Sequence, residues 1–347
     1  MTSDPSRKRP RLELEGPELS RKDEEVWLSD GNIVVIAAGE VAFRVHKSIL
    51  SLRSEVFCGL FSLPDADQGA AETMDGAPIV HVSDSPDDIR RLFLVICCGK
   101  NYYYNAGALV PVPFAVLASL IRMAHKYAIQ DVLDDALFRL KKYYTDNFRE
   151  WKDPDSRACY VTTTEADAPT VIELARLTNT PWLIPSAFLA CTQLATRSAL
   201  KYEDNSFAPA SSMFASLSTP DQVLLVQAMA RLARVSSARL LHLMGAVPCK
   251  GCTARDRCTL ARDAPALVTY NYGDMLIPPP CGKDAMEPVA EELWNALWKT
   301  FCDSCREVLV ETEEEIRMTM WNTLPEFFNV DVDLDDWDSR STRIDGP

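Results

Sequence analysis

The chain has 347 residues, of which 47% are hydrophobic and 25% are charged; this length accommodates about two domains, and the composition excludes wholesale disorder. Lysine and arginine total 36 against 50 aspartates and glutamates, and the net charge of −14 argues against broad, non-specific binding to nucleic acid. The first residues lack the apolar stretch of a secretory signal, and eleven cysteines without such a signal indicate a soluble protein of a reducing, intracellular compartment.

Residues 1–26 are polar, charged and proline-containing, so a disordered arm is predicted there. The arm contains a basic cluster of the kind found in nuclear-localisation signals: Arg7, Lys8, Arg9 and Arg11. An ordinary charged tail has the same composition, so this cluster leaves a nuclear and a cytoplasmic location both open.

Residues 32–46 are predicted to form a β-hairpin. β-branched and other apolar residues fill both arms, and Gly39 at the first turn position indicates a type II′ turn. Apolar residues at helical spacing over residues 47–61 then predict two short helices, the second of them capped by Ser54. A loop over residues 64–78, a strand over 79–82 and a helix that begins at Ser85 are predicted to follow.

Two further helices, over residues 113–127 and 129–148, complete a first domain predicted at residues 27–150. Its strands come first and its helices cluster afterwards, which predicts an α+β fold. A polar stretch with a proline and three consecutive threonines predicts a linker at residues 151–168.

Beyond the linker, the pattern predicts a mainly α-helical domain at residues 169–334, followed by an acidic tail at 335–347. Helices are predicted over residues 170–177, 185–200, 219–247 and 287–324, and irregular chain over 255–280. The long helix at 219–247 has an apolar face that is predicted to be buried: Val223, Val226, Met229, Leu232 and Leu240.

Cysteines of the second domain form two C-x-x-C pairs, Cys249 with Cys252 and Cys302 with Cys305. Four thiolates in such pairs are a common ligand set for structural Zn²⁺. The 49 residues between the pairs exceed the spacing of compact four-cysteine modules. Loop-closure entropy grows slowly with loop length, however, so a zinc site that staples this domain stays a prediction.

A core stripe is the alternative for the second pair, because Cys302 and Cys305 fall on one helical face with Trp294 and Trp298. Free cysteine is a common small buried residue, and such a stripe has the same pattern. Cys258 and Cys281 are spare ligands if the metal set is different.

The sequence contains no recognisable motif of catalytic residues. The four histidines, including His46 and His81, are isolated from one another, and no glycine-rich phosphate loop or nucleophile motif is present. We therefore predict that the chain is not an enzyme.

Residues 43–61, F-R-V-H-K-S-I-L-S-L-R-S-E-V-F-C-G-L-F, resemble the central motif of BTB/POZ domains, F-x-x-H-K-x-x-L-x-x-x-S-x-x-F-x-x-x-F. Residues 80–93 and 123–133 resemble two later segments of the family, in the same order and spacing. The matching positions, which the resemblance assigns to the fold and to interaction, are Phe43, His46, Lys47, Leu50, Ser54, Phe57, Phe61, Lys126 and Tyr127. Where the family has an aspartate at the start of the first strand, this chain has Asn32, with Asp30 two residues earlier.

The remainder is similar to long fungal, especially basidiomycete, BTB proteins, through residues 171–191, the C-x-x-C pairs and W-x-x-L-P at 321–325. The resemblance implies a non-catalytic adaptor that self-associates, or pairs with another BTB protein, by burying apolar surface of its first hairpin and helices. Many relatives are substrate adaptors for cullin-type ubiquitin ligases, which implies a cullin scaffold and an unknown protein target as partners. Others are nuclear scaffolds or transcriptional regulators without a ligase, and this alternative stays open. Neither a membrane nor nucleic acid is an expected partner.

Overall fold

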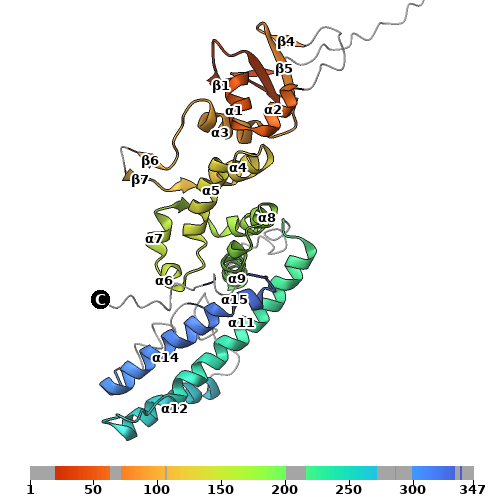
Figure 1. Cartoon of the computed structure of the whole chain (residues 1–347). Helices are drawn as coiled ribbons and strands as arrows, with labels where there is room; N and C mark the ends of the chain where they lie inside the picture. Colours follow the sequence, from red (N-terminus) through yellow and green to blue (C-terminus); the bar gives the residue numbers. More distant parts are fainter. Residues whose placement is uncertain are drawn as a thin grey trace, which may run out of the picture. The chain divides into compact units, whose positions relative to one another are not determined.

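The computed structural model describes residues 20–62, 72–105, 108–200, 216–271, 286, 299–332 and 337. They fall into two compact units (Figure 1). The first runs to Asn101 and includes Met123–Gln130, and the second comprises Tyr102–Arg122 and the chain from Asp131 onward. None of the helices in the described part of the chain combines the length and hydropathy that a bilayer crossing requires.

The first unit is built on a mixed five-stranded sheet with strand order β1-β3-β2-β5-β4. β2 and β3 form the predicted antiparallel hairpin, β5 runs parallel to β2, and β1 runs parallel to β3. The strands are β1 (Arg21–Trp27), β2 (Ile33–Ala37), β3 (Val41–Val45), β4 (Thr73–Met74) and β5 (Ala77–Val82). The helices of this unit are α1 (Lys47–Arg53), α2 (Glu55–Ser62) and α3 (Pro86–Ile96), which confirms the three helices predicted between residues 47 and 96.

The hairpin turn differs from the predicted type II′ turn. Both central residues, Ala38 and Gly39, have positive φ angles, 48° and 75°, and the N–H of Glu40 donates to the carbonyl of Ala37. This is the pattern of a type I′ turn, with Gly39 at the second position. The sequence pattern assigned the apolar Ala38 to the strand, which shifted the turn by one residue.

β1 shows that the prediction of disorder for residues 1–26 is wrong for residues 21–26. Most side chains of this strand are charged and exposed, so it lacks the apolar alternation of a predictable strand. Its buried residues are Asp23 and Val26. The Asp23 carboxylate accepts from the N–H groups of Glu25 (3.0 Å) and Val26 (2.8 Å) and pairs with Arg90 Nε at 2.7 Å, at an irregularity in the β1–β3 pairing.

The second unit is mainly helical, and α4 (Phe114–Lys126) and α5 (Gln130–Tyr143) have residues in both units. Its short strands are β6 (Tyr104–Asn105), β7 (Ala108–Leu109), β8 (Val112–Pro113) and β9 (Val161–Thr162). Its other helices are α6 (Phe148–Trp151), α7 (Pro154–Ala158), η1 (Glu165–Asp167), α8 (Ala168–Leu177), η2 (Pro181–Leu183), α9 (Ile184–Leu200), α11 (Thr219–Gly245), α12 (Arg255–Asn271), α14 (Asp303–Asn322) and α15 (Leu324–Phe327). Figure 1 shows α14 running alongside α11, with α12 at one end of the pair.

Residues 151–168, predicted as a linker, are folded into α7, β9 and η1, and β9 pairs with β8. Their polar side chains close turns and helix ends. Asp153 caps α7 by accepting from the N–H of Ser156 at 2.9 Å, and the Asp167 carboxylate accepts from the N–H of Thr164 at 2.7 Å. Capping residues and linker residues have the same composition, which explains the error.

One prediction about the helices of the second unit is wrong and another is wrong in part. Residues 255–271, predicted as irregular chain, form α12. On α11, the predicted buried face is wrong for Val223 and Val226, which are 52% and 67% exposed, and right for Leu232, which is buried together with Leu225 and Ala228. Because α11 carries apolar residues on more than one face, the spacing of its apolar residues alone does not identify which face is buried. Of the predicted helix at 287–324, residues 287–298 lie outside the described residues.

Candidate functional site

The aromatic residues of the BTB-like motif pack around one ring in the first unit. Phe43, Leu50 and Phe57 are fully buried. The Phe57 ring stacks on Tyr127 with centroids 4.4 Å apart and an interplanar angle of 4°, and on Phe61 at 5.8 Å. The motif therefore positions Phe57 at the centre of this core.

Ser54 lies between α1 and α2 and is buried. Its hydroxyl accepts from the N–H of Phe57 at 3.1 Å, which confirms the predicted cap of α2, and donates to the carbonyl of Tyr127 at 2.6 Å. One side chain thus caps a helix and fixes the chain that follows α4.

Asp84 is a buried residue of this site that the sequence reasoning missed. Its carboxylate accepts from the Tyr127 hydroxyl at 2.5 Å and from Lys126 Nζ at 2.6 Å. Burial, followed by the contact with this carboxylate, raises the pKa of Tyr127. The signal available in the sequence was the Ser-Asp-Ser segment just before α3, but it does not reveal which acid points inward.

His46 and Lys47 make structural contacts. His46 Nε2 lies 3.3 Å from Asp30 Oδ1. Asn32 Oδ1 accepts from the N–H of Lys47 at 2.8 Å, so Asn32 satisfies a donor in the first turn of α1. The Lys47 ammonium lies 5.3 Å from the centre of the Phe61 ring and 3.4 Å from the Phe61 carbonyl oxygen. At the position where the resemblance expects an aspartate, the neutral amide of Asn32 thus caps the start of α1.

Three apolar side chains on α1 and α2 face solvent, and we call them the α1–α2 patch: Leu52 (86% exposed), Val56 (44%) and Leu60 (38%). Val56 and Leu60 are four residues apart and lie on one helix face. The hairpin offers no such surface, because every residue of β2 is buried and the outer side of β3 is paired with β1. Of the hairpin and helices predicted to supply apolar surface to an interface, the helices α1 and α2 are the ones that expose large apolar side chains here.

Five cysteines come together in the second unit. The Sγ atoms of Cys252, Cys258, Cys302 and Cys305 all lie within 4.8 Å of one another. Cys302 Sγ is 3.8 Å from Cys252 Sγ, and Cys249 Sγ is 3.6 Å from Cys305 Sγ. A tetrahedral Zn²⁺ with Zn–S bonds of about 2.3 Å has sulfur–sulfur edges of about 3.8 Å, so this spacing fits one ion.

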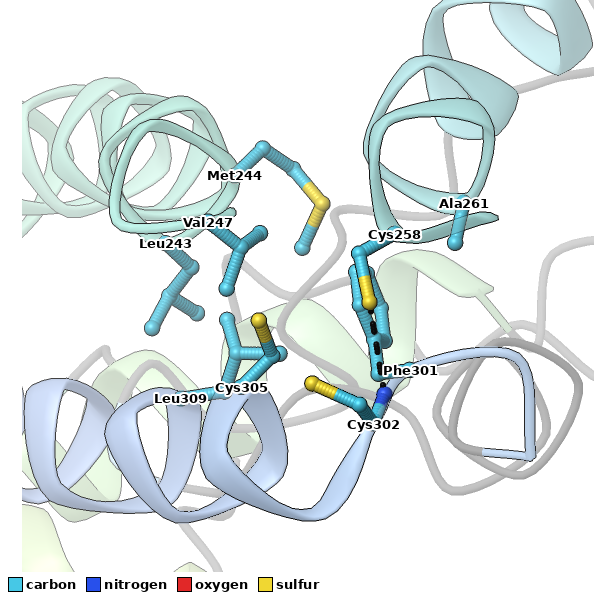
Figure 2. Packing of buried hydrophobic residues seen from close by; sticks show 9 residues of the cluster. All are labelled: Leu243, Met244, Val247, Cys258, Ala261, Phe301, Cys302, Cys305 and Leu309. Atoms are coloured by element: carbon cyan, nitrogen blue, oxygen red, sulfur yellow. Dashed lines mark hydrogen bonds between the residues drawn. The ribbon is translucent and has the colours of Figure 1, made fainter. Parts of the chain in front are cut away.

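The helices α11, α12 and α14 supply the surroundings of the cluster (Figure 2). Figure 2 shows the sulfurs of Cys258, Cys302 and Cys305 directed toward a common centre, and the N–H of Cys302 donates to Cys258 Sγ at 3.3 Å. The buried residues around this centre are Leu243, Met244, Val247, Ala261, Phe301 and Leu309. The thiols of Cys258, Cys302 and Cys305 therefore lie buried in an apolar shell, while those of Cys249 and Cys252 are partly exposed.

Backbone amides favour the thiolate form of one cysteine. The N–H of Cys305, followed by that of Thr253, lowers the pKa of the Cys302 thiol to about 5. Burial raises the pKa of the Cys305 and Cys258 thiols. Cys302 therefore forms a thiolate readily. For Cys258 and Cys305, a bound cation would favour the charged thiolate form that burial disfavours.

The predicted ligands Cys249, Cys252, Cys302 and Cys305 are all in this cluster, but Cys258 completes the mutually close set and Cys249 lies beside Cys305. Cys258 was only a spare candidate because its segment was predicted to be irregular, whereas it lies in the first turns of α12. Several predicted residues lie outside the described residues: Arg7, Lys8, Arg9, Arg11, Cys281, Trp294 and Trp298.

In the comparison with known families, residues 28–143 match the model described as BTB/POZ domain. No curated protein matches the chain significantly. The chain thus contains a BTB/POZ domain, a protein-interaction module of mixed sheet and helices, followed by a helical C-terminal region. The similarity to long fungal BTB proteins stays a prediction.

Proposed function

We propose that this chain, with its BTB/POZ domain at residues 28–143, is a non-catalytic adaptor that self-associates through the α1–α2 patch. The observation that supports the proposal is the exposure of Leu52, Val56 and Leu60 on neighbouring helices. A two-fold interface would bury the patch of each copy. Full burial of the largely exposed Leu52 contributes about 1.5–3 kcal/mol, and Val56 and Leu60, already more than half covered, contribute less.

We predict that the full chain is a dimer at micromolar concentration and that Leu52→Glu combined with Leu60→Glu makes it a monomer. Burying an unpaired carboxylate is so costly that the dissociation constant should rise by about 100-fold or more. Light scattering after size-exclusion chromatography measures the molar mass. The matched control is Val226→Glu on α11, which places the same charge at another exposed apolar position and should leave the dimer intact. A monomeric wild-type chain, or a dimeric double variant, contradicts the proposal.

We further propose that one partner is a cullin scaffold and that another is a protein destined for ubiquitination, a role held by many BTB/POZ proteins. The BTB/POZ match supports this proposal at the level of the domain. We predict that the full chain binds the N-terminal domain of the BTB-binding cullin with a Kd at or below about 1 μM, roughly 8 kcal/mol of association, in a calorimetric titration. Absence of binding up to about 100 μM by a folded sample would leave the alternative, a nuclear scaffold or transcriptional regulator, whose sequence support is the cluster Arg7–Arg11.

We also propose that the cysteine cluster binds one structural Zn²⁺ through Cys252, Cys258, Cys302 and Cys305. An all-thiolate set with four ligands leaves no open position, and such closed sites are structural rather than catalytic. This assignment is supported by the sulfur spacing and by the apolar shell that α11, α12 and α14 provide around the three buried thiols. Bound metal would hold these three helices together.

A further inference from the structure

Four aromatic rings form a continuous cluster in the second unit. The Trp321 side chain of α14 is fully buried. The centroid of its ring lies 5.9 Å from that of Phe148 and 5.3 Å from that of Trp151, both on α6. Trp337, from the acidic C-terminal segment, stacks on Trp321 with centroids 5.5 Å apart and an interplanar angle of 22°. The cluster thus joins α6 and α14 to Trp337. This residue lies ten positions after Phe327, where α15 ends.

The Trp337 side chain is held both by the packing of its indole ring and by a hydrogen bond from its N–H group. It is 5% exposed, and its Nε1–H donates to the carbonyl of Trp321 at 3.1 Å. The Trp321 indole in turn donates to the carbonyl of Asp146 at 3.0 Å, which fixes the ring on which Trp337 stacks. A buried indole with a stacking partner and a satisfied N–H is the way aromatic anchor residues bind in protein interfaces.

Cations surround the same rings. The Arg157 guanidinium lies 4.2 Å from the centre of the Trp151 ring, and Lys152 and Arg317 lie 5.1 Å and 5.9 Å from that of Phe148. The sequence around Trp337 is acidic: Asp331, Asp333, Asp335, Asp336 and Asp338. Lys152 and Arg317 both pair with Glu314. The charge complementarity between the site and the acidic segment is therefore carried mainly by the Arg157 guanidinium, which donates to the neutral carbonyl of Tyr143.

We propose that Phe148, Trp151 and Trp321 form a binding site for a tryptophan in an acidic peptide, the indole slot, and that the chain's own Trp337 occupies it. A tethered ligand acts at an effective concentration of about 1 mM, so a segment with an intrinsic Kd of about 10 μM fills its own slot about 99% of the time. A free peptide of the same kind then binds the wild-type chain about 100-fold more weakly than a chain whose slot is empty.

The test uses the full chain with Trp337→Ala and a labelled peptide of residues 331–340, with binding measured by fluorescence anisotropy. The variant is expected to bind the peptide with a Kd of about 10 μM, and the wild-type chain about 100-fold more weakly. A peptide with alanine in place of the tryptophan should not bind. Replacing Asp335, Asp336 and Asp338 of the peptide by asparagine should weaken binding about tenfold, with a smaller dependence on salt.

A folded Trp337→Ala chain that does not bind the peptide overturns the proposal, as does equal binding by the wild-type chain. If the alanine variant does not fold, Trp337→Phe retains a stacking ring but loses the N–H donor, and it should bind the peptide with a Kd between those of the other two chains. Failure of both variants to fold shows that Trp337 is a part of the core rather than a ligand, and this too overturns the proposal. Self-association through the α1–α2 patch is independent of all these outcomes.

Discussion

Replacing Cys302 by serine is expected to lower the zinc content of the purified chain from about one equivalent to under about 0.2. Structural zinc in small domains contributes roughly 10–16 kcal/mol of apparent binding free energy, and a serine hydroxyl is a poor substitute for a thiolate. Elemental analysis gives the zinc content, and thermal unfolding gives the stability. A chelator should lower the melting temperature of the wild-type chain and leave that of the variant unchanged.

Two further serine variants decide which four cysteines bind. Cys258→Ser should lose zinc as Cys302→Ser does, because the Cys258 sulfur belongs to the mutually close set, whereas Cys249→Ser should retain it. Cys159→Ser, at an exposed cysteine, is the control for loss of a thiol as such. If instead Cys249→Ser loses zinc and Cys258→Ser retains it, the ligands are the four cysteines of the two C-x-x-C pairs, as predicted from the sequence. A wild-type chain that holds under about 0.2 equivalents when purified under reducing conditions contradicts the zinc proposal.

Replacing Phe57 by alanine is expected to destabilise the first unit by about 3–5 kcal/mol. Phe57 is fully buried and stacks on Tyr127, so the change removes apolar contacts and leaves a cavity between α2 and the chain after α4. Hydrogen exchange of the β2 and β3 amides measures this unit alone rather than the whole chain.

Phe138→Ala is the matched control, because Phe138 is an exposed phenylalanine on α5 and its loss should change stability by under about 1 kcal/mol. Equal exchange rates in the Phe57→Ala and wild-type chains would mean that Phe57 is not central to this core.

Local signals explain what the sequence predicted correctly. The hairpin, the two short helices and the cap at Ser54 depend on residues that are neighbours along the chain, so the local pattern is enough to predict each of them. The α3 helix is a similar case, since Ser85 caps it by accepting from the N–H of Asp88, with Pro86 in its first turn.

Long-range contacts explain what was missed. β1 is held in the sheet by its pairing with β3 and by buried Asp23, which pairs with Arg90, 67 residues later, and no local pattern contains these contacts. Asp84 became recognisable only when Lys126 and Tyr127 were seen to surround it. Likewise, Cys258 enters the metal set because α12 positions its sulfur beside residues more than forty positions away.

The two outer strands of the five-stranded sheet, β1 and β4, have a consequence for solubility. Unpaired strand edges are templates on which other chains add strands and aggregate. Here one outer strand carries exposed charges, Arg21, Lys22, Glu24 and Glu25, and the other is only two residues long. An added strand would have to strip water from those charges on the β1 side, whereas β4 covers only Ala77 and Pro78 of β5 on the other side. The β1 edge of the sheet is thus protected by its charges against open-ended growth, and the β5 edge beyond the short β4 is where an added strand would find backbone to pair with.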